Sequence, residues 1–270
     1  MKIGVFFDHL RVASDQTSLP LEKIAREAVQ MGIEFVHVNG EFWMDNEERV
    51  DTLLEMAGLQ VGSVDFMCQL TRGEDIAETE RMIRFLSRKN VKHLLLIPGF
   101  VHEAQSRQSA MDQIAVHLKE LLYFARSMHV QCSIEDFDHA SAPYGTWQEL
   151  LWYTKKLPEL KVCFDTGNFM YHGQDEKEAY ENLTGTICMV HAKDRSFLGR
   201  EGDKPLKTQN GKALYPCAVG RGEVKMAELI ACLKQDHYHG GIIIEHFDSA
   251  DMLGDMRKSA EWLIKEIHKS

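Results

Sequence analysis

Apolar and polar positions follow two recurring patterns along the chain. Short runs of consecutive apolar residues, as at 94–97, are typical of strands that are buried on both faces. Longer stretches in which apolar residues recur every three or four positions, as at 21–29, are typical of helices that pack on one face. The two patterns alternate throughout the sequence, which indicates a repeated strand–helix unit.

The alternation predicts eight strands and eight helices. Strands are expected near 1–7, 33–38, 59–66, 94–97, 130–135, 161–165, 186–191 and 241–245. Helices are expected near 21–29, 46–57, 74–88, 103–127, 146–156, 175–183, 225–234 and 249–267. Such alternation implies a parallel sheet covered by helices, and an α/β fold of the closed (β/α)₈ TIM barrel type accounts for eight units most simply. An open doubly wound sheet is the alternative, but no G-x-G-x-x-G follows the first strand.

No linker or low-complexity segment interrupts the pattern, so we expect one domain over residues 1–270. The one irregular stretch is 195–219, and loops of this length in compact domains are usually functional or mobile. It is either a basic lid over an anionic substrate or a solvated surface. Its cationic residues are Arg195, Arg200, Lys204, Lys207 and Lys212.

Charge and cysteine usage restrict the partners and the compartment. The net charge of −10 opposes binding to nucleic acid and to anionic membranes. No apolar stretch approaches the roughly 18 residues that span a bilayer, and no signal-cleavage pattern follows the first run, so we expect a cytoplasmic protein. Assembly into a homo-oligomer is left open. Six separate cysteines without a C-x-x-C pair indicate reduced, mostly buried thiols.

Four of the later strands end in the same way, with apolar residues that run up to a metal-binding side chain. These side chains are Glu135, Asp165, His191 and Glu245. The carboxyl ends of all strands of a parallel barrel meet on one face, so the four should converge there. Three neighbouring carboxylates repel one another unless a cation lies between them. Three oxygen ligands and one imidazole suit a single divalent ion, Mn²⁺, Mg²⁺, Co²⁺ or Zn²⁺.

At these residues the sequence resembles a known family. The segments SIEDFD, CFDTGN, MVHAKD and IIIEHFD, with VGRGEV before the last helix pair, resemble the xylose isomerase-like TIM barrels over nearly the whole chain. That group holds sugar isomerases and epimerases, inosose-processing enzymes, some dehydratases and the AP endonucleases. The resemblance implies that the same four residues bind the metal, and that Glu135 and Glu245 also act as catalytic base and acid.

Departures from the family narrow the options. The endonuclease members carry additional metal-binding residues where this chain has Ile97, Leu214 and Pro216, which disfavours DNA repair and predicts a mononuclear centre. Many ketose epimerases of the group carry a histidine where this chain has Asn168. An asparagine can hydrogen-bond a substrate hydroxyl but cannot transfer a proton, so at this position the chain departs from those epimerases.

Further candidates for substrate binding lie around this centre. Lys193 and Asp194 are both candidates for substrate contact. Lys193 could bind a substrate carboxylate or phosphate, could take part in proton transfer, or could pair with Asp194. Arg221, between two glycines, could belong to a phosphate site at the start of the following helix or to a tight turn. His9 and Trp43 fall near the ends of the first two strands and could line the pocket, as could His37, near the end of the second.

The leading hypothesis is a metal-dependent isomerase or epimerase that acts on a sugar, a sugar phosphate, a sugar acid or a keto-cyclitol through an enediolate. The alternative is a lyase that dehydrates an inosose or a dehydroshikimate-like compound. A non-catalytic sugar-binding barrel and an AP endonuclease are less favoured. In the first three cases the partner is a small carbohydrate or polyol.

Overall fold

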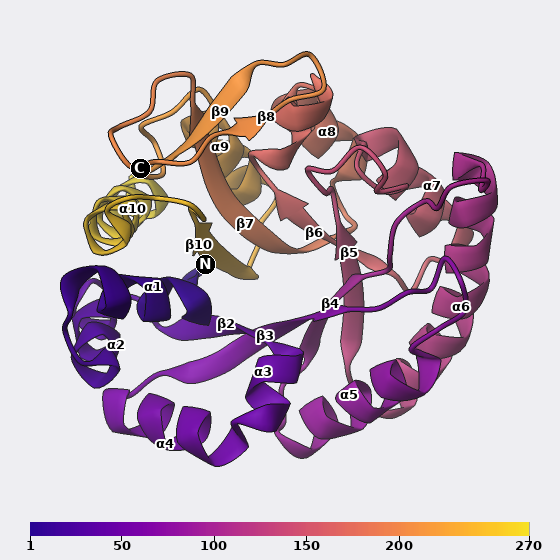
Figure 1. Ribbon diagram of the computed structural model, residues 1–270, viewed down its shortest axis with the longest axis horizontal. Helices are drawn as coiled ribbons and strands as arrows, with labels where there is room; N and C mark the ends of the chain where they lie inside the picture. Colours follow the sequence, from indigo (N-terminus) through magenta and orange to yellow (C-terminus); the bar gives the residue numbers. More distant parts are fainter. Residues whose placement is uncertain (270) are drawn as a thin grey trace.

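Eight parallel strands close into a barrel that helices surround (Figure 1). The computed structural model describes residues 1–269, so only residue 270 of the expected domain lies outside it. Strand β10 pairs with both β1 and β7, which closes the barrel and confirms the predicted fold class. The barrel strands are β1 (Lys2–Phe6), β2 (Phe35–Asn39), β3 (Gln60–Met67), β4 (His93–Ile97), β5 (Gln131–Glu135), β6 (Lys161–Asp165), β7 (Ile187–Ser196) and β10 (Gly241–Glu245).

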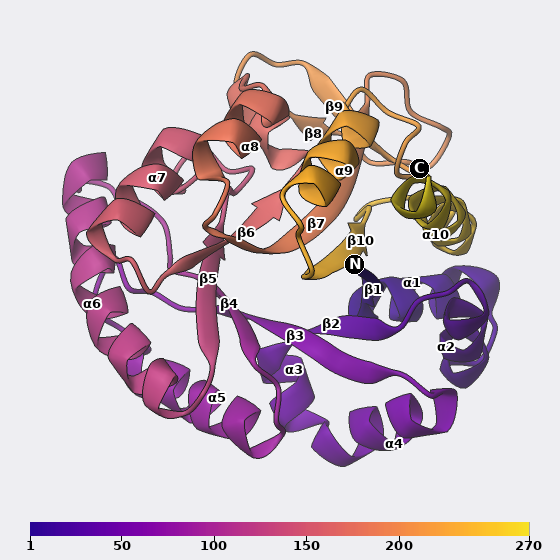
Figure 2. The same ribbon diagram turned by 180° about the vertical axis from the view of Figure 1, so that it is seen from behind.

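The helices form a ring outside the strands, which is visible from both ends of the barrel (Figures 1 and 2). Among residues 1–269, none of them is long and apolar enough to cross a membrane. They are α1 (Phe7–Thr17), α2 (Leu21–Gln30), α3 (Gly40–Asp45), α4 (Glu47–Ala57), α5 (Ile76–Arg88), α6 (Arg107–Ser127), α7 (Trp147–Lys156), the 3₁₀ turn η1 (Asn168–His172), α8 (Glu176–Leu183), α9 (Met226–Gln235) and α10 (Met252–His268).

The pattern of apolar residues did not predict α1 or α3. Strand β1 passes into α1 at Phe7 without a polar break, so the apolar run hides the start of that helix. Helix α3 has only six residues, which is too short for a helical period to show. Helix α6 begins at Arg107 rather than near 103, because the Ser106 hydroxyl accepts the N–H of Ser109 at 3.1 Å as an N-cap.

Two separate hydrophobic cores hold the barrel together. The larger core lies between the strands and the helices, and a small one fills the barrel interior around Phe6, Phe35 and Leu95. The ring of Phe35 packs directly against Gly4 and Gly62. A Cβ on Gly4 would come 2.4 Å from this ring, and a Cβ on Gly62 would come 2.3 Å from it. Glycine is therefore required there by close packing.

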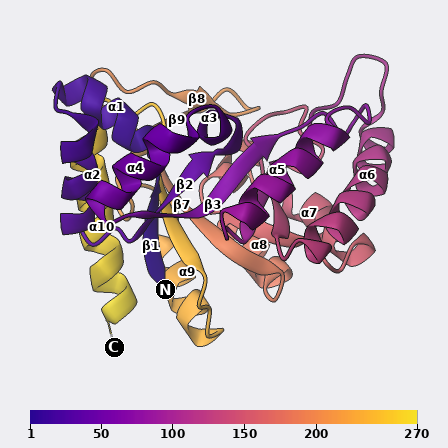
Figure 3. The ribbon, with the colours of Figure 1, turned by 90° about the horizontal axis from the view of Figure 1, so that it is seen from below.

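The stretch 195–219 contains ordered strands outside the barrel. Strand β7 continues to Ser196 instead of ending at residue 191, and it pairs antiparallel with β9 (Ala213–Cys217). Strand β9 in turn pairs with the short β8 (Leu206–Lys207). Figure 3 shows β8, β9 and α3 at the end of the barrel that lies opposite both termini. The hairpin thus lies at the carboxyl ends of the barrel strands.

Candidate metal centre and substrate cavity

Strand register brings the four predicted metal ligands to one end of the barrel interior. Asp165 pairs with His191 across β6 and β7, and Glu245 pairs with Lys193 across β10 and β7. Glu135 ends β5 and neighbours Cys163 on β6. The side chains of the four are between 0% and 9% exposed. The predicted convergence is therefore present in the geometry.

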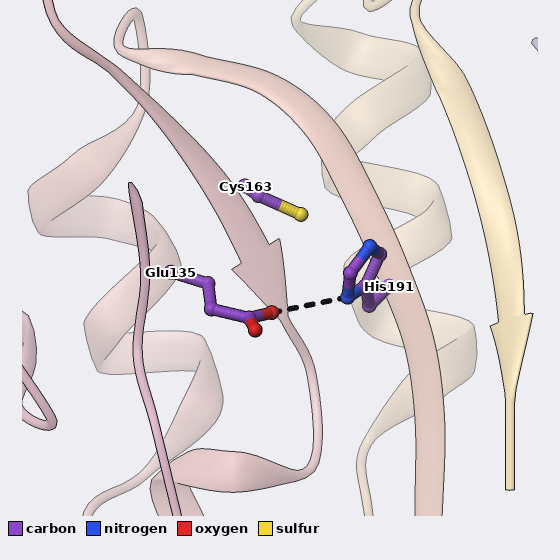
Figure 4. A group of neighbouring side chains, drawn as sticks. All are labelled: Glu135, Cys163 and His191. Atoms are coloured by element: carbon purple, nitrogen blue, oxygen red, sulfur yellow. Dashed lines mark ion pairs between the residues drawn. The ribbon is translucent and has the colours of Figure 1, made fainter. Parts of the chain in front are cut away.

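His191 lies between two of the carboxylates. Its Nδ1 is 3.0 Å from Oε2 of Glu135, as Figure 4 shows, and 3.1 Å from Oε2 of Glu245. These ion-pair contacts lack hydrogen-bond geometry, so within the described residues both ring nitrogens of His191, Oε2 of Glu135 and Oδ2 of Asp165 have no hydrogen-bond partner. Buried polar atoms in proteins are almost always satisfied, so this group of atoms is suited to a bound ion.

The spacing of these atoms fits a single metal ion. One ligand atom each from Asp165, His191 and Glu245 lies within 4.8 Å of the others. Two ligands on opposite sides of an ion with bonds of about 2.1 Å lie about 4.2 Å apart, so only small adjustments are needed. Three carboxylates with one imidazole also form a donor set that hard or borderline divalent ions accept.

Cys163 belongs to a second, overlapping group with Glu135 and His191 (Figure 4). The sequence analysis grouped it with the other buried thiols. Strand side chains alternate between the two faces, so Cys163, two residues before Asp165, also points into the barrel interior. That alternation was the signal that could have identified it. Burial raises the pKa of its thiol, which keeps the sulfur protonated and makes it a weaker candidate ligand than the carboxylates.

Burial works against the negative charges of this centre. It raises the pKa of Glu135, and it raises the pKa of Asp165 to about 8, with Glu245 and Glu135 adding to that rise. The adjacent Asp136 is also buried, and burial followed by repulsion from Asp165 raises its pKa well above the usual range. A cation bound among these groups would lower the cost of ionising them.

Lys193 reaches into the centre from β7. Its Nζ lies 2.6 Å from Oε1 of Glu245 and 3.3 Å from Oδ2 of Asp165, and it donates to Oδ1 of Asn168 at 2.7 Å. The suggested pair with Asp194 does not form, because neighbouring residues of a strand face opposite sides. The amide of Asn168 donates in turn to the carbonyl oxygen of Asp136 at 2.7 Å. Asn168 therefore fixes the position of Lys193.

Asp194 binds a turn of the backbone. Its carboxylate accepts the N–H groups of Gly220, Arg221 and Gly222 through Oδ2, at 2.8 to 3.1 Å. Its Oδ1 accepts the N–H groups of Arg195 and Val224. The turn suggested as a phosphate site is thus filled by a carboxylate of the chain itself. Asp194 is buried beneath this turn, and the side chain of Arg221 is exposed outside the cavity. Neither position supports the substrate contact that was predicted for the residue.

A cavity of about 370 Å³ opens above the metal centre. Its lining includes Glu135, Glu245, Asn168 and Lys193 of the predicted site. The other residues that line it are Phe6, Asp8, Asn39, Asp65, Leu95, Ile97, Phe137, Asp138, Arg195, Leu206, Phe247 and Asp248.

His9 and Trp43 do not line this cavity. His9 is buried beside it, where it stacks on His246 with ring centroids 4.8 Å apart and accepts the backbone N–H of His246. Burial lowers the pKa of His9 well below its usual value, so the ring is neutral. Trp43 packs edge-on against Phe85, and its Nε1 donates to Asp51 at 2.9 Å. Its position does not support the substrate contact predicted for it.

One side of the cavity was not predicted from the sequence. Asp8 follows β1, Asn39 ends β2 and Asp65 lies near the end of β3, and all three line the cavity there. We call these three residues the distal wall, because β1, β2 and β3 lie across the barrel from β5, β6 and β7. Asn39 ends β2 as the predicted ligands end their strands, which was a signal for this wall, whereas Asp65 lies two residues before the end of β3.

Comparisons with known proteins agree with this fold. The sequence model of the family described as "Xylose isomerase-like TIM barrel" matches residues 24–266. A search of curated protein sequences finds no match. Similar solved structures include the probable 3-DHS dehydratase AsbF from Bacillus anthracis, with a TM-score of 0.73, 15% identity and coverage of 98% of this chain and 99% of the other. A D-psicose 3-epimerase crystallised in the presence of D-fructose has a TM-score of 0.74 and 14% identity over 100% of both chains. The IolI protein with a bound zinc atom has a TM-score of 0.73 and 14% identity over 99% and 98%.

Proposed function

The chain belongs to the xylose isomerase-like TIM barrel family, and from that membership we propose that it is a divalent-metal-dependent isomerase or epimerase of a sugar or a related keto-polyol. The observation that carries the proposal is a group of buried atoms that can coordinate a metal ion and have no hydrogen-bond partner among the described residues. They belong to Glu135, Asp165 and His191. The similar structures support it, because they include a sugar epimerase and a protein with bound zinc.

Glu135, Asp165, His191 and Glu245 would hold the ion. When bound, a divalent cation supplies Lewis-acid stabilisation for the negative charge that develops on oxygen when a C–H bond beside a carbonyl is deprotonated. Glu245 and Glu135 reach His191 from two sides and also line the cavity, so both are placed to exchange a proton with carbon. One carboxylate takes the proton from the carbon beside the carbonyl. The second, protonated beforehand, returns a proton to the opposite face of the same carbon in an epimerase. In an isomerase a proton is returned at the former carbonyl carbon, and the hydroxyl proton of the deprotonated carbon moves to the former carbonyl oxygen.

Lys193 and Asn168 would hold Glu245 in the orientation that this proton transfer needs. Lys193 holds Oε1 of Glu245 at 2.6 Å, which leaves Oε2 directed to His191. Both ends of the Asn168 amide are occupied, by Lys193 and by the carbonyl oxygen of Asp136. Asn168 therefore orients the lysine and takes no part in proton transfer.

A metal-dependent dehydratase is the second candidate. It is supported by the similarity to the probable 3-DHS dehydratase, whose TM-score of 0.73 equals that of the zinc-binding IolI protein. Both candidates begin by removing a proton beside a carbonyl. They differ in the product, because loss of a β-hydroxyl gives a conjugated enone that absorbs in the ultraviolet.

The test is solvent deuterium exchange. Manganese-loaded protein is incubated in D₂O with ketoses, keto-acids and inososes, and proton NMR detects loss of the signal beside the carbonyl. We expect exchange by the wild type and none by Glu245→Gln or by the metal-depleted protein. Glu201→Gln, which alters an exposed carboxylate in the stretch 195–219, is the matched control and should exchange like the wild type. Full exchange by Glu245→Gln or by the metal-depleted protein would refute the proposal, and the product distinguishes an isomerase from a dehydratase.

A further inference from the structure

Two side-chain hydrogen bonds hold Asp65 in the distal wall. Its Oδ1 accepts from Nε2 of His37 at 3.1 Å, and its Oδ2 accepts from Nδ2 of Asn39 at 2.8 Å. His37 is fully buried, and its Nδ1 lies 2.8 Å from the hydroxyl of Ser63. If Nε2 of His37 donates to Asp65, Nδ1 accepts from the Ser63 hydroxyl. Both ring nitrogens of His37 then have a hydrogen-bond partner.

This network positions a carboxylate that still faces the cavity. The side chain of Asp65 is 15% exposed, while that of His37 is 0% exposed. Each carboxylate oxygen accepts one hydrogen bond from the protein and keeps a second lone pair. Both oxygens can therefore accept from hydroxyl groups of a ligand without giving up the bonds that hold them.

The charges around the cavity oppose an anionic group at this end. Six carboxylates line the cavity, against the two cations Lys193 and Arg195. Both cations are already paired, because Asp138 lies 3.5 Å from Lys193 and 3.1 Å from Arg195, and Lys193 also contacts Glu245. A phosphate or carboxylate next to Asp65 would meet like charge with no free cation among the lining residues.

Of the basic residues of the stretch 195–219, only Arg195 lines the cavity, and two others contact groups elsewhere. Arg200 pairs with Asp255 at 2.9 Å and with Asp203 at 3.1 Å. Lys212 lies over the ring of Phe197, 3.1 Å from its centroid. Leu206 is the residue of the β8–β9 hairpin that lines the cavity, and it is apolar.

We propose that Asp65 is a specificity-determining residue, which accepts hydrogen bonds from the hydroxyl groups of an uncharged polyol at the wall formed by β1, β2 and β3 and rejects substrates with a phosphate or carboxylate there. This assignment rests on the proposed function and narrows its substrate class. Sugar phosphates and sugar acids, which the sequence left open, are disfavoured. His37 and Asn39 are positioning residues for Asp65.

The test compares matched neutral and charged ligands. Dissociation constants are measured by calorimetry on manganese-loaded protein for D-fructose, D-psicose, D-tagatose and D-sorbose and for the 6-phosphate of each. We expect the parent ketose with the highest affinity to bind at least about tenfold more tightly than its 6-phosphate. Asp65→Asn keeps the shape and removes the charge, so it should reduce that ratio by about tenfold. Asp8→Asn changes the same wall and provides a second measurement if Asp65→Asn does not fold.

Asp15→Asn is the matched control, because Asp15 is exposed on α1 and lies outside the cavity lining. It should leave the ratio unchanged. The proposal would be overturned by any one of three results: a 6-phosphate that binds more tightly than its parent ketose, an affinity ratio that is unchanged in both Asp65→Asn and Asp8→Asn, or no binding of any parent ketose. Deuterium exchange on the same samples tests the function separately. If the neutral ketose binds more tightly but no deuterium exchange occurs, the isomerase proposal is rejected and the role of Asp65 in specificity is kept. If exchange occurs but the neutral ketose does not bind more tightly, the role of Asp65 is rejected and the isomerase proposal is kept.

Discussion

Replacement of Asp194 by alanine tests whether this residue holds the turn or contacts a substrate. Its carboxylate accepts five backbone N–H groups, from Arg195 and from four residues between Gly220 and Val224. A hydrogen bond to a charged group contributes about 1.5–3 kcal/mol, and a donor left buried without a partner costs about 1–3 kcal/mol. Water can reach the turn beside the exposed Arg221 and recover part of this loss. We therefore expect Asp194→Ala to lower the free energy of unfolding by about 3–4 kcal/mol.

Urea unfolding followed by circular dichroism measures this loss. Asp194→Asn keeps one oxygen acceptor and should lose about half as much, while Asp15→Ala on the exposed side of α1 should stay within about 0.5 kcal/mol of the wild type. Gly222→Ala offers an independent check, because its Cβ would come 2.2 Å from Oδ1 of Asp194. Asp194→Ala that folds should still bind manganese, since its carboxylate is bound to the turn. Unchanged stability together with weaker ligand binding would refute this reasoning and restore Asp194 as a substrate contact.

Three further predictions concern the metal, the α3 region and pH. Chelation of a bound metal should lower the melting temperature reversibly, because an ion that binds only the folded protein stabilises it, and differential scanning calorimetry before and after addition of manganese checks this. Trp43→Phe should cost about 1 kcal/mol of unfolding free energy through the lost hydrogen bond to Asp51, and calorimetric ligand affinities should not change. Burial lowers the pKa of His93 below 6.5, so the unfolded chain takes up this proton first and stability is lost as pH falls below about 6.5. His93→Gln should reduce the loss of urea stability between about pH 7 and about pH 5, and an unchanged pH dependence would contradict this role.

The barrel and the convergence of the four predicted ligand residues could be deduced from the sequence for a physical reason. Buried parallel strands are apolar runs, and a charged residue that ends such a run can only lie at the carboxyl end of the barrel. Asp165 and His191 are placed by this rule alone, and their register in β6 and β7 agrees with it. Asp65 does not follow this rule, because Phe66 and Met67 continue β3 beyond it, so its place in the cavity could not be deduced in the same way.

The partners of charged residues could not be deduced in the same way. Lys193 and Asp194 are adjacent in sequence, yet one enters the metal centre and the other binds a turn 26 residues or more away in the chain. That difference depends on how far β7 continues past residue 191, which the apolar pattern does not encode. The polar end of β7 lies outside the barrel wall, and its pairing with β9 maintains the strand there.

The pairing of β7 with β9 also separates the segment 197–212 from the barrel strands. Ser196 lies opposite Tyr215 and Asp194 opposite Cys217, so both ends of the segment 197–212 are joined to one rigid strand. Insertions or deletions inside that segment leave the strand, and with it His191 and Lys193, in place. Changes of length or sequence in this segment are therefore expected to alter the opening of the cavity, which Leu206 lines, and to leave the strand end that carries His191 and Lys193 in place.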